Sequence, residues 1–137
     1  MRQDLINSIR LPSPMNIQSF NKFVKVRNSY WIDQPGESLC QATANKRGIN
    51  YHGLNVTRPA DVRPVLILNY GFPEGVKEGY TVELFGKKWI LVDDFYPVLM
   101  CKTPLCDMRF SNTGNTYATS DVKKYLEDWL TKQKKTL

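Results

Sequence analysis

Two segments of this chain limit its fold more than any others. Segment 30–36 begins with an aromatic pair and ends in Pro-Gly, and segment 62–68 is apolar on both sides of one Arg-Pro pair. Short apolar segments punctuated by glycine and proline are typical of strands and turns. We therefore expect a β-rich module in which 62–68 is one interior strand and Pro64 causes a bulge or an edge position near its start.

Two helices are predicted, one toward each end of the chain. Ser13 and Pro14 form a favourable helix start, and apolar residues at helical spacing follow, so the sequence predicts a helix over 14–23. Ser120 and Asp121 open a second helix, whose apolar stripe is the clearest in the sequence. That stripe consists of Val122, Tyr125, Leu126, Trp129 and Leu130.

Further strands are predicted between turn residues. They lie at 39–44, 49–51, 80–85, 89–92 and 98–101, and 80–85 forms a hairpin with 89–92 around Gly86. The glycine-rich loop 69–79 is the best boundary between two possible half-modules, 1–69 and 76–137. Since 137 residues suit one domain, we expect a single α+β domain over 1–137. It would hold a small twisted mixed or antiparallel sheet with two helices and long loops.

Charge and composition narrow the choice of partner and compartment. The net charge of +6 and the pI near 9.3 favour an acidic partner, either nucleic acid or an acidic protein surface. The longest apolar runs, 65–68 and 97–101, are far shorter than the roughly 20 residues of a membrane span, so no membrane is expected. The first residues lack a secretory signal pattern, and three cysteines need no pairing in a chain of this size. A cytoplasmic location with reduced thiols is therefore expected.

Four segments carry a resemblance to a known family. Segments 30–36 and 61–66 match its Trp-Trp-Leu-Arg-Ser-Pro-Gly and Gly-Val-Arg-Pro-Ala-Leu motifs, and 85–93 and 117–126 match its Phe-Gly-x-x-Trp-x-Val-Leu-Asp and Tyr-x-x-Ser-x-(Ile/Leu)-(Arg/Lys)-x-(Trp/Tyr)-Leu motifs. The chain thus resembles a family of small bacterial and phage domains of uncharacterised function, with the two halves in swapped order. Such modules look related to the C-type-lectin-like fold. The resemblance implies a twisted sheet whose long loops form a binding platform.

No catalytic or metal-binding constellation stands out. His52 is the only histidine, so a Ser-His-Asp or Cys-His mechanism would have to use it, with Cys40, Cys101 or Cys106 as a nucleophile. A zinc site would combine it with all three cysteines. An exposed turn histidine and buried or incidental cysteines are the simpler interpretation. The chain is therefore expected to have no catalytic residues, no bound metal and no cofactor, and not to be an enzyme.

Basic residues with a neighbouring aromatic are the best candidates for partner binding. Cations position phosphates and exposed aromatics stack on bases, although a merely solvated surface is the alternative for any single patch. The candidate contact residues are Lys46, Arg47, Tyr51 and His52 in a predicted loop, Arg58 in the next loop, and Lys132, Lys134 and Lys135. The predicted structural residues are Trp31, Trp89 and Trp129 in the core, and Arg63, buried beside a carboxylate. The tyrosines expected to reach the surface are Tyr30, Tyr51, Tyr70 and Tyr96.

These features predict a binding protein. The first hypothesis is a phage or mobile-element protein that blocks or recruits a host protein or nucleoprotein, as anti-defence or anti-CRISPR inhibitors do. A nucleic-acid-binding accessory protein is the alternative, and a phage structural or receptor-recognition module is a third possibility. Binding that falls steeply with salt would distinguish the nucleic-acid hypothesis from the first.

Overall fold

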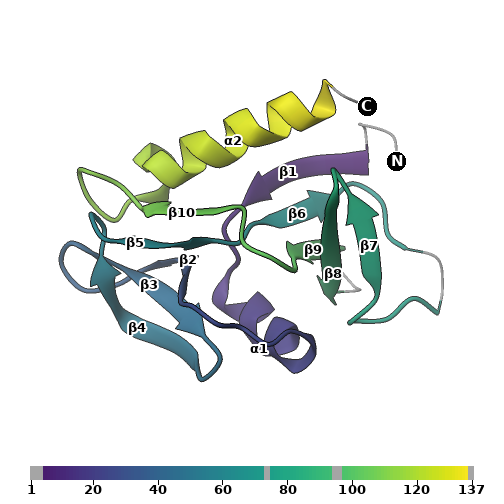
Figure 1. Cartoon of the computed structure of the whole chain (residues 1–137), viewed down its shortest axis with the longest axis horizontal. Helices are drawn as coiled ribbons and strands as arrows, with labels where there is room; N and C mark the ends of the chain where they lie inside the picture. Colours follow the sequence, from purple (N-terminus) through teal and green to yellow (C-terminus); the bar gives the residue numbers. More distant parts are fainter. Residues whose placement is uncertain (1–4, 73–74, 94–96, 136–137) are drawn as a thin grey trace.

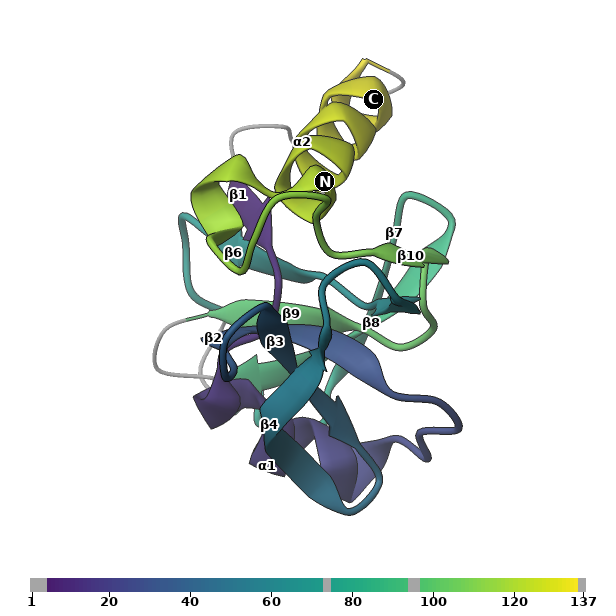
Figure 2. The ribbon, with the colours of Figure 1, turned by 90° about the vertical axis from the view of Figure 1, so that its left-hand side faces the viewer.

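The computed structural model describes residues 5–72, 75–93 and 97–135. Within them, ten strands form two five-stranded sheets, with helix α2 on one side of the sheets and helix α1 on the other (Figures 1 and 2). The elements along the chain are β1 (Ile6–Arg10), α1 (Pro14–Phe23), β2 (Tyr30–Pro35), β3 (Cys40–Asn45), β4 (Gly48–Asn55), β5 (Pro59–Val62), β6 (Val65–Leu68), β7 (Thr81–Leu84), β8 (Lys87–Asp93), β9 (Val98–Cys101), β10 (Cys106–Arg109), the 3₁₀ turn η2 (Tyr117–Thr119) and α2 (Asp121–Lys134). The fold is α+β.

The two sheets differ in strand direction. The first has the order β1-β6-β9-β8-β7 and is antiparallel throughout. The second has the order β10-β5-β2-β3-β4 and is mixed, because β2 and β5 run parallel where Tyr30 pairs with Asp61. The prediction of one sheet was therefore too simple.

The expected strand over 62–68 is divided between the two sheets. Its first residue ends β5 in the mixed sheet, and its last four form β6 in the antiparallel sheet. Pro64 has no N–H for a strand ladder, although its carbonyl still accepts a hydrogen bond from the N–H of Cys101 at 2.9 Å. The Arg-Pro pair is thus the crossing between the sheets rather than a bulge within a strand.

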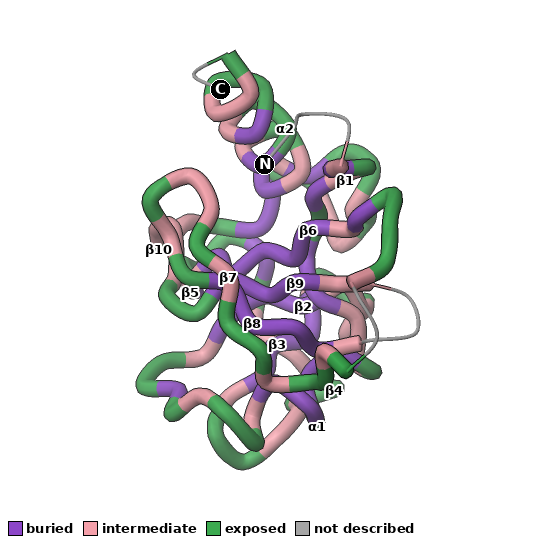
Figure 3. Tube along the Cα trace, turned by 90° about the vertical axis from the view of Figure 1, so that its right-hand side faces the viewer, coloured by how far each residue is buried: buried purple, intermediate pink, exposed green. Residues whose placement is uncertain are grey.

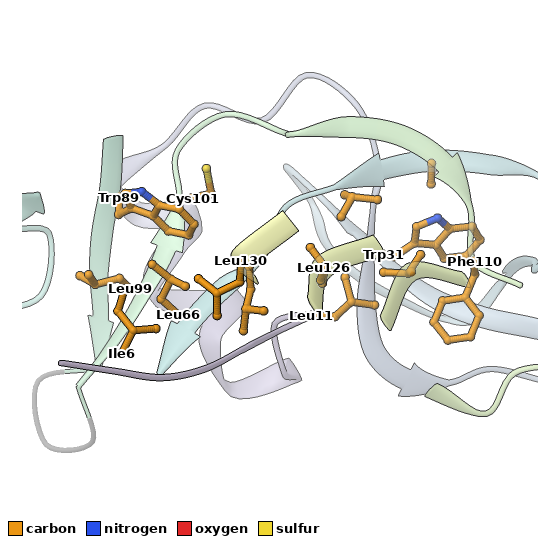
Figure 4. Close-up of a cluster of buried hydrophobic side chains, with 14 of the residues drawn as sticks. Ile6, Leu11, Trp31, Leu66, Trp89, Leu99, Cys101, Phe110, Leu126 and Leu130 are labelled. Carbon is orange, nitrogen blue, oxygen red and sulfur yellow. The ribbon is translucent and has the colours of Figure 1, made fainter. Parts of the chain in front are cut away.

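Two apolar clusters hold the layers together. The first lies under α2, where Leu126 and Leu130 sit between the part of the cluster around Trp89 and the part around Trp31 (Figure 4). The second lies under α1 and includes Phe20 and Tyr30. Because successive side chains on a strand face opposite sides, neighbours such as Tyr30 and Trp31 belong to different clusters. The central strands are consequently buried on both faces (Figure 3).

Several sequence predictions are confirmed at residue level. Helix α1 covers 14–23 and β9 covers 98–101, as expected. In α2, the Ser120 side chain accepts a hydrogen bond from the N–H of Lys123 at 3.0 Å, which is the predicted N-cap. The β7–β8 hairpin also forms, with Phe85 and Gly86 at positive φ in its turn. None of the described helices is long and apolar enough to cross a membrane.

Strands β1 and β10 were not predicted. Both belong to sheets that combine strands from the first and second halves of the chain. Strand β1 pairs with β6, which pairs with β9 from the second half. Strand β10 returns to the mixed sheet and pairs with β5. Each sheet therefore contains strands from before and after the loop 69–79, which does not divide the structure into 1–69 and 76–137 units.

Candidate nucleic-acid interface

A row of three adjoining concavities crosses the surface beside α1. The first, of about 460 Å³, lies between α1 and the β3–β4 hairpin and is lined by Arg47 and Tyr51. It shares Lys46 with the second, of about 560 Å³, which in turn shares Lys25 and Arg27 with the third, of about 240 Å³. We call this row the basic groove. Its cationic lining residues are Lys25, Arg27, Lys46, Arg47, Arg63 and Lys102.

The tip of the β3–β4 hairpin forms one wall of the basic groove. Asn45 pairs with Gly48 across the tip, and the Asn45 side-chain oxygen accepts a hydrogen bond from the N–H of Arg47 at 2.8 Å. Gly48 has a φ of 120°, a region that favours glycine. The Asn21 side chain on α1 donates to the Asn45 carbonyl at 3.0 Å. These contacts fix the position at which Lys46 and Arg47 leave the hairpin as exposed side chains.

The connection between α1 and β2 forms the facing wall. Val26 is buried in the cluster under α1, whereas its neighbours Lys25 and Arg27 are exposed. Alternation of this kind is what an extended segment with one buried face produces. The connection therefore contributes two cations to the same concavity as Lys46.

Arg63 lies at the far end of the basic groove and is only 4% exposed. Its Nη1 donates to the carbonyls of Cys101 and Lys102, and its guanidinium carbon lies 5.1 Å from the Phe20 ring centroid and 5.3 Å from that of Tyr30. Its burial confirms the expectation, but the expected carboxylate partner was wrong. Main-chain carbonyls and two aromatic rings take that place, and among the described residues no carboxylate makes an ion pair with it.

The electrostatic balance of the basic groove is strongly positive. Against its six cations stands one carboxylate, that of Asp61, in the third concavity. Burial raises the pKa of the Asp61 carboxyl, and the repulsion of Asp107 acts in the same direction, while Arg63 and a hydrogen bond with Asn28 lower it. A surface of this kind attracts polyanions and raises their rate of encounter.

The structure brings together three of the eight predicted contact residues. Lys46, Arg47 and Tyr51 share the first concavity, and the Tyr51 side chain belongs to strand β4 rather than to a loop, with 58% of the residue exposed. Its ring is free to stack on a flat ligand at that end of the basic groove.

The other five predicted contact residues lie outside the basic groove. His52 is also on β4, and its Nδ1 lies 3.0 Å from a carboxylate oxygen of Glu37. Arg58 follows the turn at the far end of β4, where its N–H donates to the Asn55 carbonyl. The remaining three, Lys132, Lys134 and Lys135, are at the end of α2, across the molecule from the β3–β4 hairpin (Figure 1). The predicted loop containing His52 is therefore a strand.

Three cations of the basic groove were missed at the sequence level. Lys25 and Arg27 flank a single buried valine, and this short alternation was the available signal. Lys102 follows β9 and reaches the groove only because β9 lies beside the Arg63 crossing. No pattern in the sequence around Lys102 indicates that proximity.

The predicted core tryptophans and surface tyrosines differ in how well the structure agrees with the expectation. Trp31 and Trp89 are fully buried, and their indole N–H groups donate to the carbonyls of Met108 and Leu84. Trp129 is half-buried and packs at the edge of the same cluster. Tyr30 is buried, contrary to expectation, because it faces the cluster under α1. Tyr70 is exposed, and Tyr96 lies outside the described residues.

The three cysteines and the single histidine were the candidates for a nucleophile or a zinc site. Cys101 is buried, and burial raises the pKa of its thiol as it does for half-buried Cys106. Within the described ranges, no three or more His, Cys, Asp or Glu residues are grouped so as to hold a metal ion. Among these residues, the zinc arrangement considered for His52 and the three cysteines is therefore not formed.

Comparisons with family models, curated proteins and solved structures find no match for this chain. The resemblance to small phage and bacterial domains, and with it the C-type-lectin-like fold, stays a prediction.

Proposed function

We propose that this protein binds nucleic acid without catalysing a reaction, and that a single strand lies along the basic groove. The observation that carries the proposal is the continuity of the groove: cations occur in each of its three concavities, and an exposed tyrosine lies at one end. Phosphates repeat along a strand, so a row of cations matches them better than it matches an isolated anion. Aromatic side chains beside such a row stack on unpaired bases whatever their sequence.

The arrangement favours a single strand over a duplex. Helix α1, the α1–β2 connection and the tip of the β3–β4 hairpin form the walls of a hollow rather than a projecting element. Reading a duplex usually requires a helix or β-ribbon that enters a groove of the nucleic acid. A strand with exposed bases can instead follow the hollow and place a base on Tyr51.

The test measures binding of a fluorescein-labelled oligothymidylate and of the matching oligouridylate over a range of salt. The variant K46Q/R47Q removes two cations of the basic groove, and K132Q/K135Q removes two from α2 as a matched control. We expect the first variant to weaken binding about tenfold and to reduce the salt slope by about 0.7 for each phosphate that is no longer neutralised. Binding that is absent at low salt, or that both variants weaken equally, would overturn the proposal.

A host protein or nucleoprotein remains a second candidate partner. Strand β4 is at an edge of its sheet and carries exposed Asn50, Tyr51 and His52 next to the basic groove, and an edge strand can pair with another chain. A blocking protein of the anti-defence type could use this edge. Tagged protein would then retain one host protein after nuclease treatment and in high salt, whereas a nucleic-acid partner would be lost under both conditions.

A further inference from the structure

The third concavity of the basic groove is built differently from the other two. Four segments meet there: the α1–β2 connection with Lys25 and Arg27, strand β5 with Asp61, the crossing with Arg63, and the loop after β9 with Lys102. Four cations and one carboxylate give this concavity a formal charge of +3. We call it the Arg63 pocket. It is the end of the row, since it shares lining residues with the middle concavity but not with the first.

Arg63 is held in place before any ligand arrives. Its Nη1 is fixed by two main-chain carbonyls, and the flanking rings of Phe20 and Tyr30 restrict the guanidinium plane. Its Nε is buried and has no hydrogen-bond partner among the described residues. Among the described residues this buried cation makes no ion pair, and the Asp61 carboxylate interacts with it only through its field, so an anion that enters the pocket adds a direct partner for the charge.

We infer that the Arg63 pocket binds the terminal phosphate monoester of the strand that occupies the basic groove. This inference rests on the proposed function and adds a preference for phosphorylated ends. A monoester carries a charge of about −1.5 to −2 at pH 7 and presents three acceptor oxygens, whereas an internal diester carries one negative charge. The higher charge and the additional acceptors suit a pocket with several cationic donors at the end of the groove.

The Asp61 carboxylate also affects which ligand the Arg63 pocket binds. Its carboxylate lines the pocket and repels a doubly charged anion more than a singly charged one, so the preference for a monoester depends on the four surrounding cations outweighing this repulsion. The carboxylate is also an acceptor for a hydroxyl of the terminal sugar. A phosphorylated terminal nucleotide therefore uses both the cationic and the acidic parts of the pocket.

The experiment compares one labelled 12-nucleotide strand in three forms: hydroxyl at both ends, 5′-phosphate, and 3′-phosphate, with the label attached internally. We expect one phosphorylated form to bind about tenfold more tightly than the hydroxyl form, and the pair of phosphorylated strands identifies which end enters the pocket. K102Q, an exposed substitution, should remove most of that preference, because it weakens binding of the preferred phosphorylated form several times more than binding of the hydroxyl form. K132Q is the matched control and should leave the preference intact.

A second measurement reports on Arg63 without changing it. The Nε–H signal of Arg63 in a ¹H–¹⁵N spectrum should shift when the preferred phosphorylated strand is added, and much less with the hydroxyl strand. Equal affinities for all three strands would overturn the inference and leave the proposed function standing. Failure of every strand to bind would overturn the proposed function itself. A phosphate preference that persists in K102Q, with no change at the Arg63 signal, would place the phosphate elsewhere and also overturn the inference.

Discussion

Arg63 shows how one residue can serve both the fold and the candidate site. It lies in the crossing between the two sheets, reaches the end of β9 through two carbonyls, and contacts rings from α1 and β2. It thereby connects four parts of the chain. An arginine suits this position because its planar guanidinium can stack on aromatic faces and donate in its own plane at the same time.

Replacing Arg63 with methionine should destabilise the protein by about 2 kcal/mol or more. The substitution keeps the apolar stem but leaves two carbonyls without their charged donor and removes two cation–π contacts. Urea unfolding followed by tryptophan fluorescence measures the loss. Arg58→Met, at an exposed turn, is the matched control and should stay within about 0.5 kcal/mol of the wild type. Equal stabilities of the two variants would contradict this role for Arg63.

Replacing Asp61 with asparagine should change how stability depends on pH. Burial raises the pKa of this carboxyl, so the folded state holds the proton more tightly than the unfolded state does. The associated stability is present below the unfolded pKa and is lost as pH rises through the folded pKa. Asp61→Asn should therefore be at least as stable as the wild type at pH 7, with a difference that shrinks as the pH falls toward 4. Urea unfolding at both pH values measures it, and a difference that grows on acidification would show the opposite sign.

At the scale of elements, local signals decided where helices and hairpins begin. The start of α2 depends on Ser120, whose hydroxyl donates to the Tyr117 carbonyl at 2.8 Å and accepts from the N–H of Lys123. The β7–β8 turn depends on two consecutive residues at positive φ, with Gly86 providing the second. Such features depend on a few neighbouring residues and are therefore visible in the sequence.

Removing the N-cap of α2 should weaken the whole protein, because α2 covers one of the two apolar clusters. Ser120→Ala is expected to cost about 1 kcal/mol, since the N–H of Lys123 then loses its part-buried hydrogen bond to the Ser120 side chain. The neighbouring exposed Thr119→Ala should cost less than about 0.5 kcal/mol. Thermal unfolding followed by circular dichroism compares them, and an equal loss in both variants would show that the cap is unimportant.

At the scale of the whole molecule, the two sheets interleave the halves of the chain. Strand β6 needs β9 as a neighbour, and β5 needs β10, so neither half contains a complete sheet. The basic groove is assembled in the same way, from segments near residues 25, 46, 63 and 102. The basic groove therefore needs both halves of the chain in place.

Separate fragments covering 1–72 and 75–137 should not fold on their own. Each would expose the apolar face that the other covers, and each would leave a strand edge unpaired. We expect neither fragment to show a cooperative unfolding transition or a dispersed NMR spectrum, and we expect the mixture to regain part of both. A fragment that folds alone would instead support the half-module interpretation of the sequence.

The sequence by itself determined the α+β class, the bounds of α1, the cap of α2, the β7–β8 hairpin and the excess of positive charge. Each follows from residues close together in the chain, whose spacing and turn chemistry act locally. Only the tertiary structure decided that 62–68 is divided between two sheets, that Tyr30 is buried, and that Lys102 joins Lys25 and Lys46 in one groove. The physical reason is that strand pairing is long-range. The partner that buries a side chain, or brings a cation to a shared surface, comes from a distant segment that no local pattern specifies.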